Sequence, residues 1–139
     1  MTDVKHATFT LERHYPVSPA KVFAAWADPA VKAGWFGAGD HSLDFRVGGR
    51  ETNRAGDFTF TSDYHDIVDG ERIVYASTLS GGAGLATVSV TTVELVPDGS
   101  GTRLVLTEQG TFLDGHEEPE WRERGTGDWL DKLGGHLGA

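Results

Sequence analysis

The stretch RIVYASTLSGGAGLATVSVTTVELVPDGSGTRLVLTEQ, residues 72–109, sets the architecture of this chain. Apolar and polar residues alternate in it over three runs, residues 72–79, 85–96 and 102–109, and this period of two is typical of half-buried β-strands. Turns rich in Gly, Asp and Ser separate the runs. Neighbouring strands with such short connections predict an antiparallel meander.

Further strands are expected upstream of this meander. Residues 6–13 and 43–47 show the same alternation, and residues 57–68 form a longer strand candidate. Asp69-Gly70 then supplies a hairpin signal that joins this strand to the next one. The sequence therefore predicts an antiparallel sheet of about six or seven strands.

Two short helices are expected after the first strand, and a long one at the C-terminus. Ser18 and Asp28 are good N-cap residues, and each is followed by a Pro, which is well tolerated in the first turn of a helix. Residues 117–137 change to a helical period, with apolar side chains recurring at spacings of three and four. This order of elements predicts an α+β domain in which the last helix lies over the concave face of a curved sheet.

The composition limits the possible functions. A chain of 139 residues fits a single domain over residues 1–139, and its net charge of −9 argues against a nucleic-acid partner. There is no Cys, which excludes disulfides, thiolate metal sites and cysteine nucleophiles. Because no run reaches roughly 18 apolar residues, we expect no membrane span and a cytoplasmic location. We expect a monomer or a weak homodimer.

Several stretches resemble, in order along the chain, the SRPBCC (START/Bet v 1-like) superfamily, and specifically its branch related to the activator of the heat-shock-protein-90 ATPase. They are VFAAWADP at 22–29, FRVGG at 45–49, YHDI at 64–67, ERIVY at 71–75 and GTRLVLTE at 101–108. The resemblance implies the helix-grip fold. The superfamily includes lipid and hormone carriers, polyketide cyclases and co-chaperone domains, so the fold by itself does not assign a function.

We expect a function in binding a hydrophobic or aromatic small molecule, and we expect neither a cofactor nor a metal. The alternatives are an enzyme similar to polyketide aromatase/cyclases and a co-chaperone-like interaction domain that stimulates an ATPase. The chain departs from the family at two positions: Thr126 stands where relatives often have Trp, and Ser77 where they often have an aromatic residue. Both departures remove bulk, so we expect a roomier and more polar pocket than in typical relatives.

The strand at residues 85–96 has two faces, and its period alone does not say which one points inward. One face carries Ser and Thr residues, including Thr91, and the other carries Val88 and Val90. A shift of one residue would exchange the two faces. The resemblance favours the hydroxyl-rich face inward, which would give a cavity that is apolar at one end and polar at the other.

The residues expected to contact a ligand are Trp35, Phe36, Phe45, Phe60, Tyr75, Ser77, Thr91, Leu104, Leu106, Glu108, Thr126 and Leu130. Among them Glu108, Tyr75 and Thr126 would orient the ligand through polar atoms. The simpler interpretation is that Trp35 and Phe36 are core packing and that Glu108 is an exposed acid. We assign no catalytic residue.

The remaining ionisable residues carry no motif. The six His residues show no metal-ligand spacing such as HExxH. His41 beside Asp40 is interpreted as an ordinary loop pair. The acidic run at residues 117–120 is interpreted as the solvated start of the last helix, without a binding role.

Overall fold

A computed structural model describes residues 2–37 and 39–138 and has one antiparallel sheet of seven strands. The strands lie in the order β1-β7-β6-β5-β4-β3-β2, so each strand from β2 to β6 pairs with the next strand in the chain, and β1 pairs with β7. Their bounds are Val4–Tyr15 for β1, Asp40–Leu43 for β2, Arg50–Ala55 for β3, Phe58–Val68 for β4, Arg72–Gly81 for β5, Gly84–Asp98 for β6 and Gly101–Leu113 for β7.

Three helices complete the fold: α1 spans Pro19–Ala27, α2 spans Pro29–Trp35 and α3 spans Pro119–His136. The Ser18 hydroxyl accepts a hydrogen bond from the backbone N–H of Lys21, and the Asp28 carboxylate accepts from two backbone N–H groups in the first turn of α2. These side chains satisfy backbone donors that the helix itself leaves free, which explains why both helices begin where they do. The two predicted N-caps are confirmed.

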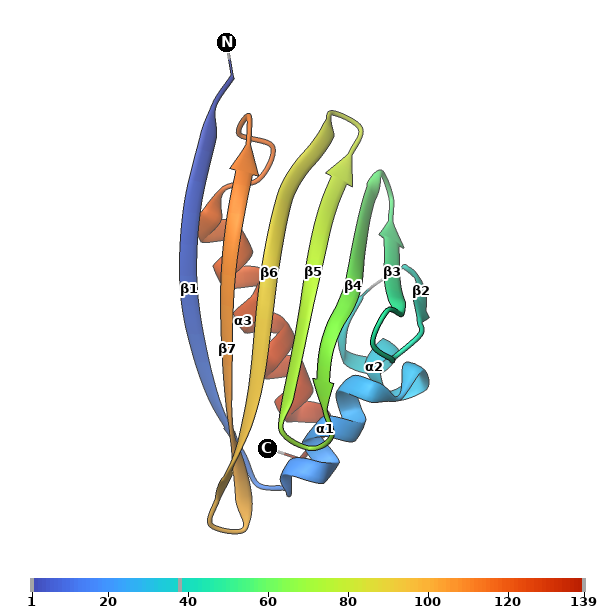
Figure 1. The fold of residues 1–139 in the computed structure, drawn as a ribbon, viewed down its shortest axis with the longest axis vertical. Coiled ribbons are helices and arrows are strands. Elements are labelled where there is room, and N and C mark those ends of the chain that lie inside the picture. The colour runs from blue at the N-terminus through green and yellow to red at the C-terminus, as the bar shows by residue number, and fades with distance from the viewer. Residues whose placement is uncertain (1, 38, 139) are drawn as a thin grey trace.

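The sheet is curved, and α3 runs across its concave face while α1 and α2 lie at one end (Figure 1). The core forms where these layers meet, around Leu104 on β7, Val93 on β6, Val22 on α1 and Leu133 on α3. The predicted α+β helix-grip fold is confirmed. No helix in residues 2–37 and 39–138 has the length and apolar character needed to cross a membrane.

One strand escaped prediction, and one was placed incorrectly. Strand β3, with the sequence RETNRA, has no large apolar residue that could reveal a period of two. Strand β2 ends at Leu43, so Phe45 and Val47 belong to the turn that precedes β3 and not to a strand over residues 43–47. In that turn Phe45 packs against the rings of Phe23 and Tyr64, because burial of its large apolar ring is more favourable than its exposure to water.

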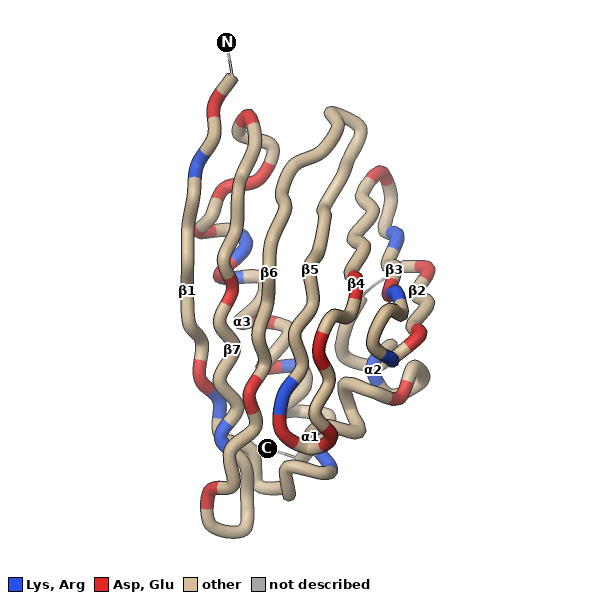
Figure 2. Tube along the Cα trace, viewed as in Figure 1, with Lys and Arg blue, Asp and Glu red and all other residues tan. Residues whose placement is uncertain are grey.

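The hydroxyl-rich face of β6 points inward, as the resemblance favoured. Thr87 and Thr91 are fully buried, whereas Val88 and Val90 keep 42% and 41% of their surface exposed on the convex side. Strands β5 and β6 also carry few charged residues along most of their length (Figure 2). Polar side chains therefore face α3 across the interior, where each needs a hydrogen-bond partner.

Candidate functional site

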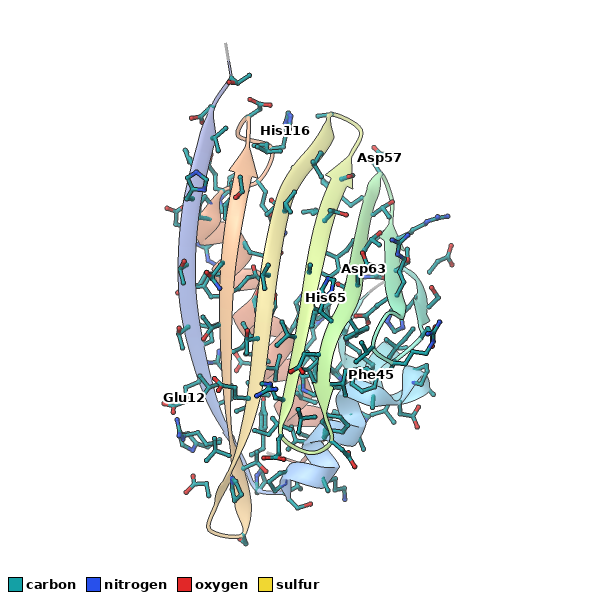
Figure 3. The ribbon with its side chains drawn as sticks, in the orientation of Figure 1. Glu12, Phe45, Asp57, Asp63, His65 and His116 are labelled. Carbon is teal, nitrogen blue, oxygen red and sulfur yellow. The ribbon has the colours of Figure 1, made fainter. Side chains whose placement is uncertain are left out.

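A cavity of about 230 Å³ lies between α3 and the concave side of the sheet. Its wall includes residues from β3, β4, β5, β7 and α3, and Trp26 and Trp35 from the two short helices. Phe58 and Trp121 also line it and are 53% and 57% exposed, so they mark its mouth. Asp57 and His116, which lie close in sequence to these two residues, are labelled near one end of the sheet in Figure 3.

Aromatic rings dominate the wall of the cavity. The aromatic residues among its described lining are Trp26, Trp35, Phe36, Phe58, Phe60, Tyr75, Trp121 and Trp129. All four tryptophans of the chain are in this set. Phe36 contacts the rings of Trp35, Phe60 and Trp129 at centroid distances of 5.9, 5.9 and 5.4 Å. Such an apolar, aromatic wall suits a flat or hydrophobic guest.

The structure places most of the predicted site residues at this cavity. Those in its wall are Trp35, Phe36, Phe60, Tyr75, Leu106, Glu108, Thr126 and Leu130. Four others lie outside it: Phe45 and Leu104 pack in the core, the Ser77 hydroxyl pairs with that of Ser62 at 2.7 Å, and Thr91 donates to Glu108. Contact with a ligand stays a prediction for all of these residues.

One end of the cavity is polar, because Arg122 of α3 reaches two carboxylates there. Its Nη1 donates to Glu108 at 3.0 Å, and its Nε and Nη2 donate to the two oxygens of Glu117 at 3.0 and 2.8 Å. Both acids are tied to β6 as well, since Thr91 donates to Glu108 at 2.9 Å and Thr87 donates to Glu117 at 2.6 Å. The cluster thereby joins α3, β6 and β7.

This cluster decides between the two interpretations of Glu108 and corrects the interpretation of Glu117. Glu108 is buried, so it is not an exposed acid, but it is held by a guanidinium that the prediction did not include. Glu117 is only 15% exposed at its side chain, so the interpretation of this residue as part of a solvated helix start is wrong. The signal in the sequence that could have revealed this cluster was Arg122. It is a charged residue on the otherwise apolar face of a helix, and a buried charge requires an oppositely charged partner.

Tyr75 lies opposite Thr91 in the pairing of β5 with β6 and contributes to the cavity wall. Burial raises the pKa of its phenol well above the ordinary value, and the carboxylates of Glu108 and Glu51 raise it further. The phenol therefore keeps its proton throughout the neutral range and can act as a hydrogen-bond donor.

Two buried polar atoms in the cavity wall have no hydrogen-bond partner among the described residues. They are the indole Nε1 of Trp26, a donor, and the amide Oδ1 of Asn53, an acceptor. Buried polar groups are nearly always paired, and an unpaired one costs about 1–3 kcal/mol. Water or a guest molecule in the cavity can supply the missing partners.

A second buried cluster lies behind the aromatic wall, around Lys32 of α2. Its ammonium donates to Glu51 at 2.7 Å and to the Tyr64 hydroxyl at 3.2 Å, and both Lys32 and Glu51 are 1% exposed. Tyr64 in turn donates to the same carboxylate at 2.9 Å, and His41 meets its other oxygen at 2.7 Å. The interpretation of His41 as a loop pair with Asp40 is therefore wrong, because its partner comes from the strand that escaped prediction.

Opposing effects act on the charges of this second cluster. Burial would raise the pKa of Glu51, but Lys32, His41 and Tyr64 together hold it below its usual range. Burial lowers the pKa of Lys32, and Glu51 opposes that shift. The rings of Phe36 and Trp26 surround the ammonium at 4.8 and 5.2 Å, distances at which cation–π attraction stabilises the charge.

A curved sheet that grips a long helix over an aromatic cavity defines the START/Bet v 1-like class of proteins. The chain belongs to the Activator of Hsp90 ATPase homolog 1-like protein family, whose model matches residues 16–138.

Solved structures agree with this assignment. A protein from Rhizobium leguminosarum is 37% identical, with a TM-score of 0.94 over 99% of this chain and 97% of its own. The Mll3558 protein from Rhizobium loti is 42% identical, with a TM-score of 0.91 over 97% of this chain and 99% of its own. PFC0360w, an HSP90 activator from Plasmodium falciparum, shares the fold at 22% identity, with a TM-score of 0.60 over 73% of this chain and 71% of its own. No curated protein matches the chain.

Proposed function

We propose that this protein binds a hydrophobic, aromatic-containing small molecule in the cavity under α3. The observation that carries the proposal is a largely aromatic cavity whose wall also holds two buried polar atoms, Trp26 Nε1 and Asn53 Oδ1, that have no partner among the described residues. Apolar walls supply affinity, and a few fixed polar groups supply orientation, which is the usual composition of a small-molecule site. Tyr75 and Glu108 offer further polar atoms to the same guest.

A thermal-shift panel of flavonoid-like, lipid-like and polyketide-like compounds tests this proposal. A ligand present at 100 times its dissociation constant adds about 2.7 kcal/mol to the free energy of unfolding, which raises the melting temperature measurably. Each compound that stabilises the protein is then titrated while tryptophan emission is recorded, because all four tryptophans line the cavity. A panel without a single stabilising compound would contradict the proposal.

A ring-closing enzyme is the second candidate, favoured by the presence of a protonated Tyr75 and a carboxylate, Glu108, in one cavity wall. Such a pair would assist proton transfer within a bound polyketide-like chain. Incubation of the hits with wild-type protein and with Glu108→Gln tests this candidate by chromatography. Turnover that the variant loses, and that the exposed-site control Glu94→Gln keeps, would favour the enzyme over the carrier.

A co-chaperone role is the third candidate, and it rests on family membership and on the shared fold of the HSP90 activator from Plasmodium falciparum. A direct assay decides it: purified protein added to an Hsp90 would raise the rate of ATP hydrolysis. No change in that rate at a large molar excess would remove this candidate.

A further inference from the structure

The polar end of the cavity carries an excess of negative charge. Of the described residues that line the cavity, the charged ones are Glu108, Glu117 and Arg122, so two carboxylates share one guanidinium. The cluster behind the wall does not compensate for this excess, because the ammonium of Lys32 is already matched by Glu51. The formal charge that a guest meets in the wall is therefore −1.

The hydrogen bonds in the cluster show the same imbalance. Arg122 has five N–H donors, and four of them are engaged, by Glu108, by Ser89 and twice by Glu117. Two carboxylates offer about eight acceptor positions, and together they accept five hydrogen bonds. The acceptor capacity that remains exceeds the donor capacity, so a guest with N–H groups fits this end better than a guest carboxylate.

The phenol of Tyr75 is a further polar group in the cavity wall, and the charges of the cluster act on it. Burial raises its pKa most and Glu108 raises it further, while the opposing effects of Thr91 and Arg122 are smaller. A negative potential at this point of the wall favours a positive group on the guest.

The rest of the wall also suits a cation. Faces of aromatic rings attract ammonium groups, and rings of the wall already hold charges in this way. The Arg122 guanidinium lies 5.8 Å from the ring of Phe60, the Lys32 ammonium 4.8 Å from that of Phe36, and the Lys132 ammonium 4.6 Å from that of Trp129. Asn53 Oδ1, which has no partner among the described residues, is an acceptor for an N–H donor of the guest. Trp26 Nε1 would in turn donate to a neutral oxygen or nitrogen elsewhere on the guest.

From these observations we infer that the ligand is a hydrophobic cation, namely an aromatic molecule with a protonated amine that lies against Glu108 and Glu117. This inference rests on the proposed function and deepens it, because it assigns the charge of the guest. An anionic guest would have to displace a carboxylate from Arg122, and the displaced carboxylate would then be left unpaired.

Three probes of nearly the same shape test the inference: naphthylmethylamine, naphthylmethanol and naphthoate, titrated by calorimetry at neutral pH. We expect the amine to bind about tenfold more tightly than the alcohol, and the carboxylate to bind more weakly than the alcohol. Equal binding of the amine and the alcohol, or tighter binding of the carboxylate, would overturn the charge assignment and leave the proposed binding function intact. Binding of none of the three up to their solubility limits would contradict the binding function, and the charge assignment with it.

Two variants and a control locate the effect. Glu117→Gln removes the excess charge and should bring the ratio of amine to alcohol affinity close to one. Asn53→Asp adds a carboxylate to the wall and should raise that ratio above its wild-type value. Glu120→Gln makes the same chemical change on an exposed residue of α3 and should leave the ratio unchanged. A fall of the ratio in Glu120→Gln as large as in Glu117→Gln would mean that overall charge, and not the cavity, causes the preference.

Discussion

Arg122 on α3 and Glu108 on β7 form a buried ion pair, with Nη1 and Oε2 3.0 Å apart and each side chain less than a tenth exposed. The pair fixes the helix to the concave face of the sheet at the polar end of the cavity. Because the same guanidinium also holds Glu117, one residue contributes both to the packing of α3 and to the charge that a guest encounters.

Arg122→Met should destabilise the protein strongly. Loss of the guanidinium leaves the carboxylates of Glu108 and Glu117 buried without a cation, and removing one partner of a buried ion pair costs about 3–5 kcal/mol. Urea unfolding monitored by circular dichroism measures this cost. Arg122→Lys keeps the charge but cannot form the bidentate hydrogen bond to Glu117. Its free energy of unfolding should therefore lie between those of wild type and Arg122→Met. Arg124→Met, at an exposed position on the same helix, should have the same free energy of unfolding as wild type.

Asn53→Leu should stabilise the ligand-free protein and weaken ligand binding. The substitution replaces an amide whose buried oxygen has no partner among the described residues with an apolar group of similar size, so we expect a gain of about 1 kcal/mol in the free energy of unfolding. The affinity for any amine found by calorimetry should fall, because its N–H loses this acceptor. A variant that is both less stable and unchanged in affinity would refute the role assigned to Asn53.

Thr126→Trp should close the cavity and leave the fold intact. Thr126 lies in the cavity wall on α3, and an indole there can extend into the space that we assign to the ligand. Isothermal titration with the best compound of the panel should show no binding, while the circular dichroism spectrum and the melting temperature stay close to those of wild type. Thr126→Val, which has nearly the same size as Thr, should keep most of the affinity. Undiminished binding by Thr126→Trp would place the ligand elsewhere.

The buried carboxylate of Glu51 should make stability depend on pH in the acid range. Its pKa in the folded protein lies below the ordinary value of 4.5, so ionised Glu51 contributes stability above that value. The contribution is lost as the pH falls through the folded-state pKa. In urea unfolding at a series of pH values, the difference in stability between wild type and Glu51→Gln should shrink from pH 6 to pH 3. The exposed-site control Glu94→Gln should differ from wild type by the same small amount at every pH, and a constant difference for Glu51→Gln would show that its ionisation is not linked to folding.

Patterns within short segments were enough to predict most of the fold. Ser18 and Asp28 cap the two short helices because capping depends only on residues within one turn. The alternation in β5, β6 and β7 revealed those strands because half of their side chains are buried. Strand β3 lacks that alternation, so its own residues did not reveal it. The strand forms because it pairs with β4.

Part of the candidate site could be predicted in the same way, and part could not. Leu106 and Glu108 were expected at a cavity because they share one face of a strand, and Phe60 and Tyr75 were included as aromatic residues near it. Arg122 and Glu108 are separated by 14 positions, and no local rule connects a residue of a helix to one of a strand that lies beneath it. The contact between Lys32 and Glu51 is of the same kind, since it joins α2 to the strand that has no apolar signature.

The sequence by itself determined the order of the elements, the caps of the helices and the two alternating faces of each regular strand, because these follow from the period and chemistry of neighbouring residues. Only the tertiary structure decided which ionisable groups meet: Arg122 with two carboxylates, and Lys32 with Glu51, His41 and Tyr64. The physical reason is that a buried charge requires a partner, but any acidic residue that the fold brings within reach can serve.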